Sequence, residues 1–251
     1  MSMWNQQRLT VILPTYNEHL SIADCIQRFE ALGIVDEIIV VNNNAHPDTS
    51  PAVATTGARE VFEPVQGYGA AIRRGLQESH DADLVCICEP DGTFDPEDIL
   101  KLLPYTGDVD VVFGSRTVQE FILAGANMGT FLKWGNWAVA KLTEVLFNTV
   151  YLSDVGCTFR VMNRRSVDHI APQLERNGSA LGFEMMVRVV SSDLSFVQLP
   201  VNYNARVGES SVTGSRMKAI WLGLEMIRLC FAHRLRRSGT PIAPSRRGAE
   251  G

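Results

Sequence analysis

Short apolar runs rich in β-branched residues recur along the first half of the chain, and polar loops and helical patterns lie between them. These runs occupy residues 9–13, 37–41, 84–88 and 110–113, with a further strand expected at 58–62. Each run is too short for a helix, and the amphipathic stretches between them indicate β-α-β units with right-handed crossovers. We therefore predict an α/β fold in which helices flank a mostly parallel sheet.

The composition limits the class of protein. With 251 residues, of which 45% are hydrophobic, the chain can bury the core of one large domain, expected to span residues 1–215. A basic amphipathic helix is expected at 216–237 and a disordered tail at 238–251. The formal net charge of −5 gives no reason to expect a nucleic-acid partner. The five cysteines lie mostly in apolar runs, which indicates buried thiols rather than zinc ligands.

The run at 84–88 stops at two carboxylates, Glu89 and Asp91, which are separated by one proline. Because side chains alternate in extended chain, both can point the same way beyond the carboxyl end of the strand, where open α/β sheets bind ligands. Adjacent carboxylates repel each other unless a cation lies between them, and such oxygen ligands suit Mg2+ or Mn2+ carrying phosphates. Alternatively, the two acids belong to a solvated turn that caps the next helix.

Two earlier strand ends carry further polar groups. Tyr16, Asn17 and Glu18 follow the first strand, and Asn42 follows the second. Because the carboxyl ends of parallel strands lie on one edge, these groups should meet the acid pair and form a site for a nucleoside and its diphosphate–metal unit. The turn at Gly67 opens a helix and either offers backbone N–H groups to a phosphate or is only a tight turn.

The second half of the chain differs in character. Residues 121–150 interleave aromatic and aliphatic side chains with glycines and lysines, and Trp134, Trp137 and Lys141 have helical spacing. This helix and the basic one at 216–237 can either lie in a membrane interface or pack on the domain. No signal-peptide pattern and no apolar run of about 18 residues is present, so we expect a cytoplasmic protein, with peripheral binding to the membrane left open.

The remaining patterns predict a loop at 153–160 that leads into a basic helical stretch, a helix at 181–190 and a strand at 196–201. The loop at 206–211 contains arginine, glycine and serines, which are suited to binding an anion.

Six motifs follow one another along the chain: Pro14-Thr15-Tyr16-Asn17-Glu18, Glu37-Ile38-Ile39-Val40-Val41-Asn42, Glu89-Pro90-Asp91-Gly92, Gly114-Ser115-Arg116, Gly156-Cys157-Thr158-Phe159-Arg160 and Arg206-Val207-Gly208-Glu209-Ser210. In this order they resemble the family-2 glycosyltransferases over about residues 8–215. The nearest subgroup contains dolichyl-phosphate mannosyltransferase and the bacterial polyprenyl-phosphate sugar transferases. The resemblance implies a GT-A fold, a GDP- or UDP-sugar donor, a divalent cation and inversion at the anomeric carbon.

The resemblance also implies roles for particular residues. Glu89 and Asp91 match the metal motif of the family, while Arg116 and Arg206 would face phosphates. The residues expected to hold the nucleotide are Pro14, Thr15, Tyr16, Glu18, Asn42 and Gly67. Those expected at the acceptor phosphate are Lys133, Arg206 and Ser210.

The chain departs from the family pattern at several positions. Asn42 and Asn43 stand where the family usually has two aspartates, and Glu89 replaces the first aspartate of the metal motif. Thr93 stands where the mannosyl enzymes tend to have a glutamine, and Ser211 where a lysine often follows. The two asparagines allow base or ribose selection to differ from that of the family.

The expected reaction is transfer of the sugar to a polyprenyl phosphate at the cytoplasmic membrane face, with Asp91, Arg116 and Asp154 as catalytic residues. A lipid phosphate is already an anion and needs cationic guidance, whereas a hydroxyl acceptor needs a base, for which Asp154 or Glu184 is the candidate. Two alternatives remain: transfer to a soluble hydroxyl acceptor, and a non-catalytic nucleotide-sugar-binding protein on the same fold.

Overall fold

The computed structural model describes residues 4–126, 129–149, 151–208 and 216–237. Its strands form one sheet in the order β3-β2-β1-β4-β6-β5-β7. All neighbouring pairs are parallel except those made by β6, which is antiparallel to both β4 and β5. The strands are β1 (Leu9–Thr15), β2 (Glu37–Asn42), β3 (Arg59–Phe62), β4 (Leu84–Ile87), β5 (Val111–Ser115), β6 (Arg160–Asn163) and β7 (Phe196–Pro200).

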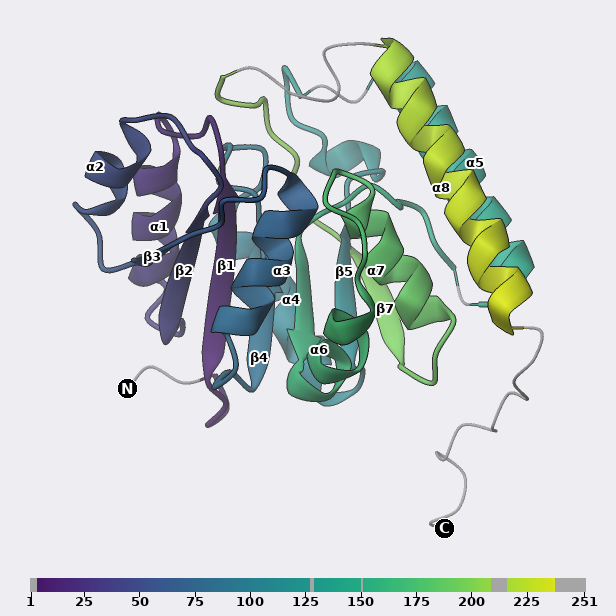
Figure 1. Cartoon of the computed structure of the whole chain (residues 1–251), viewed down its shortest axis with the longest axis horizontal. Helices are drawn as coiled ribbons and strands as arrows, with labels where there is room; N and C mark the ends of the chain where they lie inside the picture. Colours follow the sequence, from purple (N-terminus) through teal and green to yellow (C-terminus); the bar gives the residue numbers. More distant parts are fainter. Residues whose placement is uncertain (1–3, 127–128, 150, 209–215, 238–251) are drawn as a thin grey trace.

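Helices cover both faces of this sheet (Figure 1). The α-helices are α1 (Ile22–Ala31), α2 (Thr49–Val53), α3 (Tyr68–Glu78), α4 (Ile99–Leu102), α5 (Thr130–Phe147), α6 (Arg164–Ile170), α7 (Leu181–Val190) and α8 (Arg216–Arg237). Short 3-10 helices occupy Pro96–Asp98, Leu103–Gly107, Gln119–Phe121 and Ala171–Gln173. α8 runs alongside α5 on the side of the molecule away from α1 and α2 (Figure 1).

Alternating side chains of the central strands build two separate cores. Val11 and Leu13 of β1 pack with buried residues of α1, α2 and α4, whereas Ile12 packs with buried residues of α3, α5, α7 and α8. On the second face α3 lies so close to β1 that a Cβ built on Gly75 would be 2.3 Å from Cγ2 of Ile12. Helices therefore cover both faces of the central strands, as expected of a mostly parallel sheet between helices.

The observed fold is the predicted α/β architecture, with one strand that the sequence pattern does not reveal. Residues 160–163, expected to belong to a loop and a helical stretch, form β6 in the middle of the sheet, and the helix begins only at Arg164. α8 matches its predicted bounds and shares the core of α5 and α7 through Met226, Leu229 and Cys230. All five cysteines are buried and free. The predicted tail at 238–251 lies outside the described residues.

Candidate active site

Three loops meet at the carboxyl edge of the sheet, as their positions after parallel strands predict. The loops after β1 and β2 are joined by a hydrogen bond from the backbone N–H of Asn43 to the carbonyl of Thr15 (3.0 Å). The loop after β4 is joined to the start of α1, because the hydroxyl of Ser21 donates to the carbonyl of Pro90 (2.6 Å). A cavity of about 1400 Å3 opens at this edge.

Glu89 of the acid pair lines this cavity, and the buried Asp91 contacts Arg206, which lines it as well. Asp91 is buried, and its Oδ1 accepts hydrogen bonds from the backbone N–H (2.9 Å) and the hydroxyl (2.5 Å) of Thr93. Its Oδ2 accepts no hydrogen bond from the described residues, and its contact is an ion pair with Nη2 of Arg206 at 2.5 Å. The same guanidinium nitrogen lies 3.3 Å from Oε2 of Glu89. Both carboxylates therefore face one point, as the alternation of side chains predicts.

The electrostatics of the pair suit a divalent cation. Burial, followed by repulsion from Asp91, raises the pKa of Glu89 to about 7, although Arg206 and Arg116 act to lower it. A buried carboxylate oxygen without a hydrogen bond, next to a second carboxylate, is a donor set that fits a hard cation such as Mg2+ or Mn2+. Arg206 supplies the positive charge at this point in the structure.

The loop after β1 forms another part of the cavity wall. Pro14, Thr15, Tyr16 and Glu18 all line it, and the ring of Tyr16 is 45% exposed. Oε2 of Glu18 accepts hydrogen bonds from the backbone N–H groups of Tyr16 (2.7 Å) and Asn17 (2.9 Å) and from the hydroxyl of Thr15 (3.2 Å). Glu18 therefore fixes the shape of the loop and leaves the aromatic face of Tyr16 open to a base.

Asn42 does not occupy the position that the sequence predicts for it. Its amide donates to Glu60 (2.8 Å) and Ser50 (3.3 Å), its oxygen accepts the backbone N–H of Ala45 (2.9 Å), and it is not among the residues that line the cavity. The cavity is lined instead by the next residue, Asn43. The predicted nucleotide contact of Asn42 is corrected to a structural role in the loop after β2.

The turn at Gly67 is a tight turn rather than a free phosphate site. Gly67 has a φ of 140° and donates its N–H to Oδ1 of Asn43 (2.7 Å). The N–H groups of Gly69 and Ala70 donate to the carbonyl of Asn177 at 2.6 and 3.2 Å. Because these three donors already have acceptors in the protein, they would have to break those bonds to hold a phosphate. Gly67 itself lines the cavity, and its contact with the nucleotide stays a prediction.

Arg116, at the end of β5, lines the cavity and is held by Asp154. The Asp154 carboxylate accepts from the backbone N–H (2.8 Å), Nε (2.9 Å) and Nη2 (3.0 Å) of Arg116 and from the amide of Asn136 on α5 (2.7 Å). Burial acts to raise the pKa of Asp154, but Arg116 and Asn136 outweigh it and lower the pKa to about 2. Asp154 is therefore a poor general base, and its geometry is that of a residue that positions Arg116.

The other candidate base is occupied as well. Glu184 is 1% exposed and accepts the backbone N–H groups of Glu175 and Arg176 and a side-chain N–H of Arg188. Its carboxylate therefore fixes the segment before α7, and the predicted base role is corrected to a structural one.

Of the remaining two acceptor residues, the structure describes only Lys133. Lys133, on α5, donates to Gln119 at 3.3 Å and is not among the cavity-lining residues. Ser210 lies outside the described residues.

Some residues of the site carry no signal in the sequence pattern. Asn136 joins α5 to Asp154, and Tyr203 lines the cavity with its ring centroid 5.2 Å from the guanidinium carbon of Arg116. Both come from segments whose register against β5 depends on the tertiary fold. The helical pattern of residues 121–150 indicates only that Asn136 could belong to a helix.

The cavity continues from the acid pair into an apolar half between α5, α7 and α8. Aliphatic and aromatic side chains line this half of the cavity; they are Leu132, Val139, Leu142, Phe183, Ile220, Leu224, Met226 and Ile227. One continuous cavity therefore joins charged groups at the sheet edge to an apolar groove between helices.

A mostly parallel sheet between helices, with two acids after β4 and an exposed aromatic residue after β1, is the arrangement expected of a GT-A glycosyltransferase fold. The sequence profile of Glycosyl transferase family 2 matches residues 10–171. The chain therefore belongs to the family-2 glycosyltransferases, and it is a transferase by this membership.

Relatives with assigned names support this placement. The chain is 29% identical over 211 residues to the low-salt glycan biosynthesis hexosyltransferase Agl6 of Haloferax volcanii, covering 81% of this chain and 49% of Agl6, so it spans about half of that protein. It is 28% identical to the dolichyl-phosphate hexose transferase of the same organism, covering 94% of this chain and all (100%) of the relative. It is 27% identical to the undecaprenyl-phosphate mannosyltransferase of Micrococcus luteus, covering 82% and 88% of the two chains.

A solved structure shares the fold. Glucosyl-3-phosphoglycerate synthase of Mycobacterium tuberculosis, in complex with Mn2+, UDP and phosphoglyceric acid, superposes with a TM-score of 0.67 at 18% identity, covering 95% of this chain and 81% of that one. Among the described residues, every helix is too short or too polar to cross a bilayer.

Proposed function

We propose that this protein transfers a sugar from a nucleotide-diphosphate sugar to a polyprenyl phosphate at the cytoplasmic membrane face, with inversion at the anomeric carbon. The observation that carries the proposal is the single cavity that joins the acid pair and Arg116 to the apolar groove between α5 and α8. A lipid phosphate needs such a site, because its headgroup is charged and its chain is apolar. The names of the two relatives that act on dolichyl and undecaprenyl phosphate point to the same acceptor class.

On the donor side, Glu89 and Asp91 would hold the divalent cation, and Tyr16 would stack on the base. When bound, the cation stabilises the charge that develops on the leaving nucleoside diphosphate. The Mn2+ and UDP in the structural neighbour support this assignment, although Mg2+ fits the same oxygen ligands. Arg206, which pairs with both acids, would then be free to contact a phosphate of the donor or the acceptor.

On the acceptor side, the geometry favours an anion over a hydroxyl. A hydroxyl must lose its proton as it attacks, but the carboxylates of Asp154 and Glu184 are both buried and hydrogen-bonded. A phosphate monoester is already ionised, and Arg116, held in place by Asp154, is positioned to attract it. The direction of attack is then set by the walls of the cavity rather than by proton transfer.

The outer faces of α5 and α8 support binding to a membrane surface. Large apolar side chains that do not line the cavity are exposed along both helices; they are Trp134, Trp137, Val145, Met217, Trp221, Phe231 and Leu235. Lys218, Arg228 and Arg234 are exposed among them. Tryptophans with interspersed cations are typical of helices that lie in the headgroup region of an anionic bilayer. A lipid acceptor would then reach the groove without leaving the membrane.

The test is a transfer assay with purified protein, GDP- and UDP-sugars, polyprenyl phosphate in anionic liposomes, and Mg2+ or Mn2+. We expect a sugar–phospholipid product that disappears with Asp91→Asn and persists with Asp81→Asn, which changes an exposed acid far from the cavity. Activity that survives Asp91→Asn, or no transfer with any donor, would contradict the proposal.

A second measurement distinguishes transfer to a lipid acceptor from transfer to a soluble acceptor. Co-sedimentation with anionic liposomes should be lost when Trp134, Trp137 and Trp221 are replaced together by serine, and retained with Tyr105→Ser. Tyr105 is a matched control because it is 43% exposed and lies in another part of the fold. If the protein ignores liposomes and transfers sugar to a soluble hydroxyl compound, the rival function holds; binding of a nucleotide sugar without turnover would indicate the non-catalytic alternative.

A further inference from the structure

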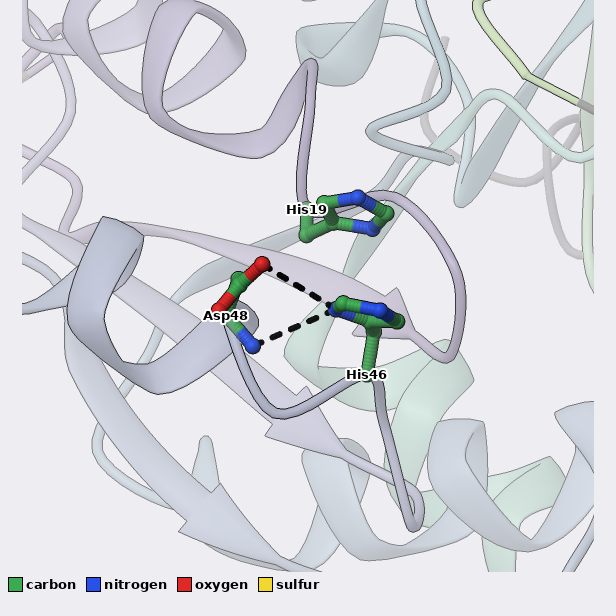
Figure 2. Close-up of side chains that lie close together, drawn as sticks. All are labelled: His19, His46 and Asp48. Atoms are coloured by element: carbon green, nitrogen blue, oxygen red, sulfur yellow. Dashed lines mark hydrogen bonds and ion pairs between the residues drawn. The ribbon is translucent and has the colours of Figure 1, made fainter.

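A second group of metal-ligating side chains lies outside the cavity, on the loops that follow β1 and β2. His19 comes from the loop between β1 and α1, and His46 and Asp48 come from the loop between β2 and α2 (Figure 2). One ligand atom of each residue lies within 4.8 Å of those of the other two. The three residues are separate from Glu89 and Asp91 and are not part of the cavity lining.

The backbone holds the two loops together at this point. His46 donates its backbone N–H to the carbonyl of Tyr16 at 2.7 Å. The strands that precede the two loops, β1 and β2, are paired from Thr10 to Thr15 of β1. The cluster is therefore built on the end of a paired β-ladder, and its side chains meet because the fold fixes their Cα positions. Chance encounters of mobile side chains are not needed to bring them together.

The side chains leave ligand atoms available. Nδ1 of His19 is buried and has no hydrogen-bond partner among the described residues. Nδ1 of His46 accepts the backbone N–H of Asp48 at 3.2 Å and lies 3.7 Å from Oδ2 of the same residue (Figure 2). A buried ring nitrogen without a partner is costly, and a bound ligand is one of the ways in which proteins satisfy such a group.

We propose that His19, His46 and Asp48 bind a transition-metal ion of intermediate hardness, namely Zn2+. Two imidazoles and one carboxylate are the ligands that Zn2+ prefers, whereas Mg2+ takes oxygen ligands. The acid pair and this cluster would therefore select different metals on chemical grounds.

Binding requires one movement. The two imidazole rings are stacked, with centroids 3.9 Å apart and planes inclined by 17°. A metal ion lies close to the plane of each imidazole that binds it, so two nearly parallel rings cannot both reach one ion. Zn2+ would rotate the His46 ring, which is the more exposed of the two, out of the stack and bring the ligand atoms to about 3.4 Å from one another.

The ion would join the loop that follows β1 to the loop that follows β2. These loops carry Tyr16 and Asn43, which line the nucleotide end of the cavity. Zn2+ at this site would therefore stabilise the wall of the cavity without taking part in the chemistry. The proposal rests on the cluster alone and does not depend on the transfer reaction.

The test is calorimetric titration of chelator-treated protein with Zn2+ in buffer that contains Mg2+ to occupy the acid pair. We expect one equivalent of Zn2+ to bind, and the affinity to fall by at least about tenfold in His46→Ala. It should be unchanged in Asp91→Asn and in His80→Ala, a matched control in which an exposed histidine lies 3.4 Å from Asp81. Co2+ bound to the same protein should give the intense visible absorption of a low-coordinate site.

Asp48→Asn is a second variant, because the side chain of Asp48 is 75% exposed and its replacement should not impair folding. It should also weaken Zn2+ binding. The proposal is overturned if the folded wild-type protein binds no Zn2+, or if both His46→Ala and Asp48→Asn bind it as tightly as the wild type does. Loss of binding in Asp91→Asn alone would assign the ion to the acid pair instead.

Discussion

Replacement of Arg206 by glutamine should increase the affinity of the protein for Mn2+ in the absence of a nucleotide. The guanidinium lies 2.5 Å from Oδ2 of Asp91 and 3.3 Å from Oε2 of Glu89, so it occupies the point where a divalent cation would bind. A cation that enters must therefore break this ion pair, and the glutamine variant removes that competition. Glutamine keeps most of the side-chain length, so the loop after β7 should retain its backbone contacts.

The size of the effect follows from the geometry of the pair. Unit charges about 4 Å apart attract each other by about 4 kcal/mol at an effective dielectric constant of about 20. The Arg206 side chain is 25% exposed, so solvent screening and side-chain ordering reduce the net value of the pair to about 1.4 kcal/mol. We therefore expect Mn2+ to bind about tenfold more tightly to Arg206→Gln.

The assay is a Mn2+ titration followed by electron paramagnetic resonance at pH 8.5. This pH is needed because the pKa of Glu89 is about 7 and rises further when the arginine that lowers it is removed. Arg206→Lys keeps the charge and serves as the control, with an affinity close to that of the wild type. Unchanged or weaker Mn2+ binding in Arg206→Gln would refute the idea that the guanidinium and the cation compete for the acids.

The other predictions concern pH, positioning and packing. Burial raises the pKa of Glu89 from 4.5 to about 7, so between these pH values the folded protein holds a proton that the unfolded chain releases. The contribution of Glu89 to stability is therefore lost as pH rises through about 7. Glu89→Gln should flatten that part of the curve of melting temperature against pH. Asp154→Asn should lower the free energy of unfolding by about 3 kcal/mol, measured by urea denaturation, because Arg116 loses its buried partner. Any transfer activity that remains in this variant should keep the wild-type pH profile, whereas loss of the acidic limb of that profile would restore the role of Asp154 as a general base. Gly75→Ala should destabilise the protein by about 1–3 kcal/mol through its clash with β1, while Gly107→Ala, with open space around it, should not.

The sequence predicts a helix or a strand well where the local spacing of apolar residues also decides which side chains are buried. The helix expected at 181–190 and the one at 216–237 coincide with α7 and α8, because each has apolar side chains at helical spacing. β6 escapes prediction because its first residue is Arg160, which is 1% exposed in the middle of the sheet. Its guanidinium donates to the carbonyls of Thr158, Cys157 and Gly182, and the last of these comes from α7. No local pattern shows that a charged residue will find such partners.

The same distinction separates the site residues. Glu89 and Asp91 can be predicted to point together because they follow one strand, and alternation along the chain decides their direction. The roles of Asn42 and Gly67 depend instead on residues distant in the sequence. Asn42 is bound by Glu60, and the turn that Gly67 opens is held by the carbonyl of Asn177. A polar residue that follows a strand can therefore bind a distant part of the protein instead of a ligand, and its position in the sequence does not show which of the two it does.

The charges of the site explain why one divalent cation is the expected complement. Arg206 lies within 4.0 Å of three carboxylates, those of Glu18, Glu89 and Asp91, so this group carries two excess negative charges when all three acids are ionised. The raised pKa of Glu89 reflects this excess as well as its burial. A cation of charge +2 balances the group and leaves the arginine free for the phosphates that arrive with the donor. The Arg116–Asp154 pair is neutral by comparison and needs no cation, so the divalent cation should go to the acid pair.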